Sequence, residues 1–259
     1  MLRFLTAGES HGKALVTIVE GVPAGLAIDL DALTADLRRR QTGYGRGRRM
    51  QIESDRAEPL SGVRHGLTTG GPIALLIPNK DWENWQRTMH VEAEMPAGAP
   101  GVDRPAVTRP RPGHADLAGF VKYGHDDMRN VLERASARET AARVAIGAIA
   151  RQLLRQVGTE IVSHVFTIGS ASIADPLAIT FERARAISDD SALHCADAAV
   201  EQKMVAEIDR AREAGGNAFD DCHERLAVRL ASSQKTQHRR FILSEKIAAS
   251  CRGCFLARR

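Results

Sequence analysis

Residues 13–20 read KALVTIVE, a run of β-branched residues that partly alternates with other types. The segments FLTA at 4–7 and GLAIDL at 25–30 have a similar character. Alternation over this length is typical of half-buried strands, so the sequence predicts a sheet at the N-terminus. PIALLIP at 72–78 predicts another strand, one that is buried on both faces.

Helices are expected between and after these strands. Leu30, Leu33 and Leu37 share one helical face, which an aspartate at 29 or 31 could cap. Ser136 and Glu139 have the spacing of a capping box at the start of a long helix. A strand over 159–169 and an amphipathic helix over 196–214 follow. Because strands and helices mix without strict alternation, we predict an α+β fold.

Length and charge limit the function classes. The 259-residue chain has no apolar run long enough to cross a bilayer, and its N-terminus reaches charged residues too early for a signal peptide. We therefore expect a cytoplasmic protein with no membrane partner. The formal net charge is +4, but residues 216–259 alone carry +5, which leaves −1 for residues 1–215. With only 4% aromatic residues, this distribution argues against a nucleic-acid partner.

Residues 216–259 also hold three of the four cysteines, Cys222, Cys251 and Cys254. The single cysteine before them, Cys195, provides no disulfide framework and suits a reducing compartment. The tail cysteines and neighbouring histidines contain only one C-x-x-C half of a zinc motif. We therefore predict no metal site.

The first segment with residues that could take part in catalysis is GESHG at 8–12. It fits the pattern of a hydrolase nucleophile elbow around Ser10, but an elbow joins a strand to a helix, and a strand-like segment follows here. Two interpretations of His11 remain open. The imidazole is either held by hydrogen bonds in a tight turn, or it approaches a ligand and exchanges a proton near neutral pH.

Arginines are unusually dense between residues 38 and 49. Guanidinium groups match phosphate and carboxylate geometry, so this segment predicts a site for a small, multiply anionic ligand. A solvated surface face and a nucleic-acid patch are the alternatives. The six residues concerned are Arg38, Arg39, Arg40, Arg46, Arg48 and Arg49.

A second histidine, His114, lies in the proline-stiffened segment RPRPGHAD at 109–116. Shortly after it, Arg134, Ala135 and Ser136 lie at the start of the expected long helix, where backbone N–H groups and the helix dipole favour an anion. Two histidines among many arginines predict proton transfer on an anionic substrate. Trp82 and Trp85 are expected in the core.

The segments GESHGKALVTIVEGVP (8–23), RRRQTGYGRGRRM (38–50), RPRPGHADLAGFVKYG (109–124) and ERASARETAARVA (133–145) together closely resemble chorismate synthase. SGVRHGLTTGGPIALLIPNKDW (61–82) resembles the same family. The resemblance implies a carbon–oxygen lyase of the shikimate pathway. Its reaction is the anti-1,4-elimination of phosphate from 5-enolpyruvylshikimate 3-phosphate to give chorismate, which leads to the aromatic amino acids. It requires reduced FMN, for which NADPH is a candidate reductant.

The resemblance also implies roles for particular residues. His11 matches the proton donor near the flavin, and His114 matches the histidine that assists the leaving phosphate. Cofactor contacts are implied for Arg40 and Arg46, at positions assigned to NADP or the anionic pocket, and for the FMN-contacting Arg134, Ala135 and Ser136. Substrate contacts are implied for Ser10, Arg48 and Arg49.

The family fold is a β-α-β sandwich, generally a homotetramer. The resemblance covers residues 1–215 and stops at the point where the composition changes. We therefore expect an N-terminal chorismate synthase portion at 1–215 and a divergent basic tail at 216–259, frameshifted or disordered, so that the sandwich is incomplete at its C-terminal end. The alternative to an active enzyme is a truncated, non-catalytic remnant that still binds phosphate-bearing ligands.

Overall fold

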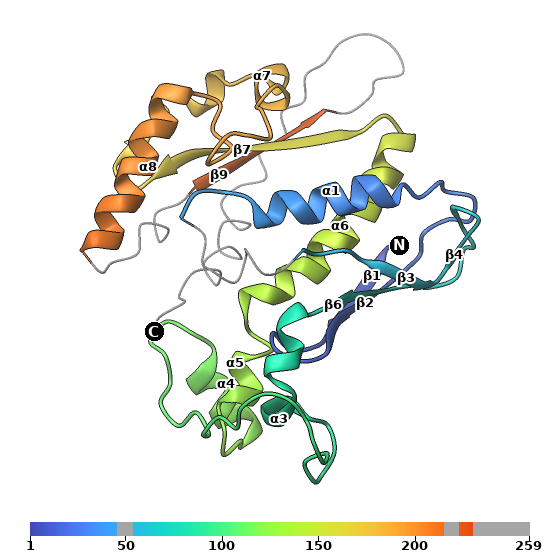
Figure 1. The fold of residues 1–259 in the computed structure, drawn as a ribbon. Helices are drawn as coiled ribbons and strands as arrows, with labels where there is room; N and C mark the ends of the chain where they lie inside the picture. Colours follow the sequence, from blue (N-terminus) through green and yellow to red (C-terminus); the bar gives the residue numbers. More distant parts are fainter. Residues whose placement is uncertain (46–53, 215–222, 230–259) are drawn as a thin grey trace. The chain divides into compact units, whose positions relative to one another are not determined.

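The computed structural model describes residues 1–45, 54–214 and 223–229 (Figure 1). The chain forms two compact units. Unit 1 consists of Met1–Arg38 and Arg48–Ile149, and unit 2 consists of Arg39–Gly47 and Ala150–Arg259. Helices and antiparallel sheets mix in both units, which confirms the predicted α+β class.

A four-stranded sheet forms the centre of unit 1. Its order is β1-β2-β6-β3, and every neighbouring pair is antiparallel. The four strands run side by side in Figure 1. They are β1 (Arg3–Ala7), β2 (Ala14–Glu20), β3 (Glu58–Ser61) and β6 (Ile73–Pro78). The strands predicted from FLTA, KALVTIVE and PIALLIP are therefore confirmed.

Two details of the strand predictions are wrong. β6 buries Ile73, Leu75 and Ile77 while the residues between them are only half-buried, so one face of this strand is in the core rather than both. In GLAIDL, only Ala27 forms a bridge, to Leu67 in the short hairpin of β4 (Val63–Arg64) and β5 (Leu67–Thr68). The pairing is short because Asp29 already caps α1, which begins at Leu30.

Helix α1 (Leu30–Gln41) follows this bridge. Leu33 and Leu37 are fully buried, whereas Leu30, at the start of the helix, is exposed. The Asp29 carboxylate accepts hydrogen bonds from two backbone N–H groups of the first turn and so caps the helix, as one of the two alternatives predicted.

The elements that complete the candidate site around the β1–β2 turn come after β6. They are η1 (Lys80–Asn84), α3 (Gln86–Met89), α4 (Asp116–Tyr123), α5 (Arg129–Leu132) and η2 (Ala137–Glu139). Residues 90–115 join α3 to α4 as an irregular loop, which includes the proline-rich segment expected to be one. The long helix α6 (Thr140–Gln156) continues from η2 and buries Ala141, Ala145 and Ile149.

Unit 2 has a three-stranded sheet of order β8-β7-β9 and a separate core around Ile168, Met204 and Ile208. Its elements are β7 (Glu160–Ile168), β8 (Ala171–Ser172), η3 (Pro176–Ala178), α7 (Phe181–Arg185), α8 (Ala198–Glu213) and β9 (His223–Arg229). β9 belongs to the segment 216–259 and pairs antiparallel with β7. This part of the basic tail is thus a strand.

Candidate active site

The GESHG segment forms the turn between β1 and β2. Gly8 has a φ of +98°, and a Cβ there would lie 2.3 Å from the Ala14 carbonyl oxygen, so the turn requires glycine. The Asn79 side-chain amide donates to the carbonyl oxygens of Glu9 (3.0 Å) and Gly12 (2.7 Å). Because Asn79 directly follows β6, these bonds fix the turn against the end of that strand.

A buried arginine holds Asn79 in turn. Arg138 Nε donates to Asn79 Oδ1 at 2.8 Å, and Nη1 of the same guanidinium donates to the Asp55 carboxylate. All three side chains are buried, and buried polar groups need such partners. The bonds therefore connect η2, before α6, to the GESHG turn.

His11 is held by the carboxylate of Glu133. Its ring Nδ1 lies 2.9 Å from both carboxylate oxygens, and its backbone N–H donates to Oε2 at 2.8 Å. The Glu133 side chain is completely buried, while 21% of the His11 side chain is exposed. Trp85 stacks on the imidazole with ring centroids 3.8 Å apart. His11 Nε2 lies 4.0 Å from Asp81 Oδ2.

Ser10 connects the turn to the segment before α6. Its backbone N–H donates to the Glu133 carbonyl at 3.0 Å, and its hydroxyl accepts from Ser136 Oγ at 3.0 Å. Ser136 is also the N-cap of η2, since its hydroxyl accepts from the Arg138 N–H. Ser10 thus lies in a strand-to-strand turn, which agrees with the rejection of a nucleophile elbow.

The expected capping box is only half formed. Although Ser136 caps η2, the Glu139 carboxylate accepts hydrogen bonds from Thr6 and from Arg143. Burial opposes ionisation of this carboxyl, but the hydrogen bonds from Arg143 and Thr6 outweigh it and hold the pKa of Glu139 below its ordinary value. The first helical turn after Ser136 is 3-10, and α6 begins at Thr140.

Arg134 points toward β1. Its Nη2 donates to the carbonyl oxygen of Thr6 at 2.8 Å and to the Thr6 hydroxyl at 2.7 Å. Its Nη1 lies 3.6 Å from Glu139 Oε1. Nη1 is buried and makes no hydrogen bond within the part of the chain that the structure describes. Ala135 follows with an exposed side chain.

His114 lies in the loop before α4. Its Nδ1 is 2.9 Å from the Pro112 carbonyl oxygen, so Nδ1–H donates there. Two residues on, the Asp116 carboxylate accepts a fork of two hydrogen bonds from Arg111, of 2.8 and 2.9 Å. This fork lowers the pKa of Asp116. Besides the hydrogen bonds to Asp116, the charge of Glu133, the residue that holds His11, also acts on Arg111 of the His114 loop and helps to raise the pKa of that guanidinium.

Unit 1 therefore brings together Ser10, His11 and Ser136, and Arg134, two residues before Ser136, donates to Thr6 of β1. Arg40 lies near the end of α1, in unit 2, and is not among the residues that unit 1 assembles. Arg46, Arg48 and Arg49 fall outside the described residues.

The sequence analysis did not relate three residues to His11: Glu133, Asp81 and Trp85. The expectation that Trp85 is core was wrong, because its ring is half-buried between His11 and Arg104, whose guanidinium lies 4.0 Å from the ring centroid. The Trp85 N–H donates to Asp81 Oδ2 at 2.9 Å. Only the rarity of tryptophan in the chain could have drawn attention to this position, since nothing in its spacing relates it to residue 11.

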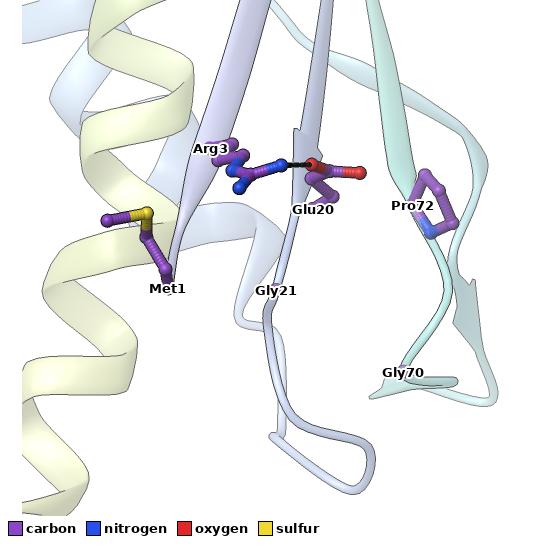
Figure 2. A pocket seen from close by; sticks show the side chains of 6 residues that line it. All are labelled: Met1, Arg3, Glu20, Gly21, Gly70 and Pro72. Atoms are coloured by element: carbon purple, nitrogen blue, oxygen red, sulfur yellow. Dashed lines mark ion pairs between the residues drawn. The ribbon is translucent and has the colours of Figure 1, made fainter.

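The pocket shown in Figure 2 is a different feature. It lies where β1 begins and β2 ends, lined by Met1, Arg3, Glu20, Gly21, Gly70 and Pro72. The register pairs Arg3 with Glu20 and Ala7 with Val16, so this pocket and the GESHG turn are at opposite ends of the hairpin. An exposed ion pair between Arg3 and Glu20 is its main polar feature.

Within residues 1–45, 54–214 and 223–229, no group of three or more histidine, cysteine or acidic side chains is arranged to hold a metal ion. The C-x-x-C segment at 251–254 and Cys222 lie outside these ranges. Among the described helices, none is long and apolar enough to cross a membrane.

The fold and the site define an α+β protein with a partly exposed histidine that is hydrogen-bonded to a buried glutamate, close to Ser10 and Ser136. The family model described as chorismate synthase matches residues 2–218, and the chain therefore belongs to the chorismate synthase family. A solved structure titled as the crystal structure of chorismate synthase aligns with a TM-score of 0.66 and 37% identity, covering 88% of this chain and 58% of that one.

Curated relatives agree with this assignment. The chorismate synthase of Desulforudis audaxviator (strain MP104C) is 57% identical over 223 residues, covering 85% of this chain and 56% of the relative. That of Bacillus pumilus (strain SAFR-032) is 51% identical, covering 83% of this chain and 55% of the relative. The chain thus spans about half the length of the curated relatives it matches.

Proposed function

We propose that this chain catalyses the chorismate synthase reaction, the anti-1,4-elimination of phosphate from 5-enolpyruvylshikimate 3-phosphate to give chorismate. Membership of the family supports this proposal. The single observation that carries it is the His11 imidazole, which is anchored through Nδ1 on a buried carboxylate while its side chain stays partly exposed. This is the arrangement of a histidine placed for proton exchange with a bound ligand.

The substrate class fits the charges around the turn. A molecule with one phosphate and two carboxylates requires several fixed cations, and guanidinium groups bind both kinds of anion through paired N–H groups. Arg134 contributes one such group beside Ser10 and Ser136. We assign further substrate contacts to Ser10, Arg48 and Arg49.

The two histidines take different parts in the proposed mechanism. His11 exchanges a proton with the bound ligands, and His114 donates to the phosphate as the carbon–oxygen bond breaks. The Nδ1 of each ring is already hydrogen-bonded, to Glu133 in one case and to Pro112 in the other. We therefore assign the transferred proton to Nε2 in both residues. Stabilising the developing phosphate anion in this way lowers the barrier to elimination.

The segment from Arg134 to Ser136 fits reduced FMN. Arg134 Nη1 is a buried donor without a hydrogen-bond acceptor among the described residues, next to the exposed Ala135 and the Ser136 hydroxyl. An oxygen of the cofactor would satisfy this donor. Reduced FMN, when bound, supplies the electron density that no side chain of the protein can provide. Arg40 and Arg46 are assigned to cofactor binding as well, with NADPH as a reductant.

The decisive experiment is an anaerobic assay with 5-enolpyruvylshikimate 3-phosphate and chemically reduced FMN, in which both phosphate and chorismate are measured. We expect equimolar release of the two products. The matched control is the Glu20→Gln variant, because Glu20 lies at the opposite end of the hairpin. Release of neither product by well-folded wild-type protein would reject the proposal.

The second candidate function is that of the non-catalytic remnant, which binds phosphate-bearing ligands without turning them over. The buried Arg134 Nη1, which has no hydrogen-bond acceptor among the described residues, supports binding of such a ligand. Titration of reduced FMN under anaerobic conditions, with and without substrate, separates the two. The enzyme should bind the flavin more tightly when substrate is present, whereas the remnant should bind phosphate compounds without this coupling.

We further propose that the protein works in the cytoplasm as a homotetramer. Light scattering of the purified chain measures the assembly directly, and a monomer at micromolar concentration would contradict this part of the proposal.

A further inference from the structure

The Glu133 side chain contacts both the ring and the backbone of His11. Its two carboxylate oxygens lie 2.9 Å from Nδ1, and Oε2 also accepts the backbone N–H at 2.8 Å. Its own backbone carbonyl accepts the N–H of Ser10 at 3.0 Å. A single buried residue before η2 therefore fixes two consecutive residues of the turn.

We propose that Glu133 is a positioning residue that fixes the tautomer of His11, so that Nε2 is the ring atom that exchanges the proton. The consequence for catalysis rests on the proposed function. A carboxylate can only accept hydrogen bonds, so the nitrogen that it contacts must carry a proton. With the proton of the neutral imidazole held at Nδ1, Nε2 is the nitrogen that loses and regains one.

The surroundings of the ring limit its other orientations. Trp85 stacks on one face of the imidazole with an interplanar angle of 21°. A half-turn of the ring about χ2 would put Cδ2 in the place of Nδ1 and so remove the bonds to Glu133, and the ring would have to leave its stack on Trp85 while it turns. Asp81 Oδ2 lies 4.0 Å from Nε2, which is beyond hydrogen-bond distance, and the Asp81 oxygens accept from Trp85 Nε1 and Asn84 Nδ2. In this geometry Asp81 does not hold a proton at Nε2, whereas Glu133 holds one at Nδ1.

The variant Glu133→Gln tests this inference sharply. Glutamine offers one acceptor oxygen and one NH₂ group in nearly the same shape. The His11 backbone N–H can only donate, so it takes the amide oxygen, and the NH₂ group then faces Nδ1. Because the ring can change tautomer and the backbone cannot, Nδ1 becomes the acceptor and the proton moves to Nε2. The variant should thus invert the tautomer.

The readout is the ¹⁵N chemical shifts of the ring nitrogens in histidine-labelled protein at alkaline pH, on the neutral imidazole. The His11 signals are those lost in His11→Ala. We expect the Nδ1–H form in the wild type and in the controls Glu20→Gln and Asp81→Asn, and the Nε2–H form in Glu133→Gln. A wild-type imidazole protonated at Nε2 would overturn the proposal, even if the Glu133 variant does not fold.

Kinetics provide a separate test. If the chain is active, Glu133→Gln should reduce kcat by between ~10-fold and ~10⁴-fold, the range for losing the partner that orients a working histidine, with KM unchanged. An inverted tautomer with unchanged kcat would refute the positioning role and leave the proposed function intact. An inactive wild-type chain with the expected tautomers would refute the proposed function alone.

Discussion

Breaking the buried ion pair between Arg138 and Asp55 by removing one partner should cost more stability than breaking an exposed pair of unit 1. Only 4% of the Arg138 side chain and 1% of the Asp55 side chain are exposed. In Asp55→Ala, the guanidinium would stay buried, with Asn79 Oδ1 at 2.8 Å and the Pro78 carbonyl at 3.3 Å among its remaining acceptors. Removing one partner of a buried pair costs about 3–5 kcal/mol, and we expect a loss in this range.

The comparison is the pair between Arg3 and Glu20, whose side chains are 72% and 53% exposed. Because water screens exposed charges, Glu20→Ala should cost at most about 1 kcal/mol. The double variant Asp55→Leu/Arg138→Met removes both buried charges and should be more stable than Asp55→Ala. Urea unfolding followed by circular dichroism gives the free energies of unfolding of the wild type and the three variants.

Two results would refute this reasoning. One is a cost for Asp55→Ala no larger than that for Glu20→Ala. The other is a double variant no more stable than the single one. Either would mean that water reaches the guanidinium and that burial of the pair does not determine its energy.

Further predictions concern the turn and the loop. His11→Ala and His114→Ala should each slow phosphate release by ~10²–10⁴-fold, and wild-type rates would contradict their roles. Gly8→Ala should lower the free energy of unfolding in urea by about 1–3 kcal/mol more than Gly25→Ala does. Both glycines have positive φ, but only the Cβ at position 8 would meet backbone atoms. Equal costs would contradict this reasoning. The hydrogen bonds to Asp116 hold its folded pKa below the ordinary value of 3.8, so their contribution to stability is complete above that pH and is lost as the pH falls through the lower folded value. Asp116→Asn should therefore reduce the loss of unfolding free energy as the pH falls below 3.8. An unchanged pH dependence would contradict the stabilising role of the Arg111–Asp116 hydrogen bonds.

The strands and helices of the N-terminal part followed from local patterns. Alternation in β2 and the leucine face of α1 each predicted an element that the structure contains. The prediction for GLAIDL failed because the Asp29 cap starts a helix at Leu30, so that only a bridge at Ala27 forms. The strand β9 was missed because its pairing with β7 joins segments far apart in the sequence, which periodicity does not reveal.

The candidate site was predictable only in part. His11 and Ser10 stood out by their glycine-flanked motif, and the bond from Ser136 to Ser10 joins two segments that had been singled out separately. Glu133 gave no signal, since a glutamate before a helix is ordinary and its importance comes from the burial of its carboxylate against a residue 122 positions away. Asn79 gave no signal either, because it holds the GESHG turn through hydrogen bonds to Glu9 and Gly12, which are far from it in the sequence.

Because Trp85 stacks on His11, the intrinsic tryptophan fluorescence of the protein can report on this histidine. An indole in contact with an imidazole ring loses emission when that ring gains a proton, and the protein has only two tryptophans. In a Trp82→Phe background, the remaining fluorescence would therefore follow the protonation of a single histidine, without any attached dye and without turnover.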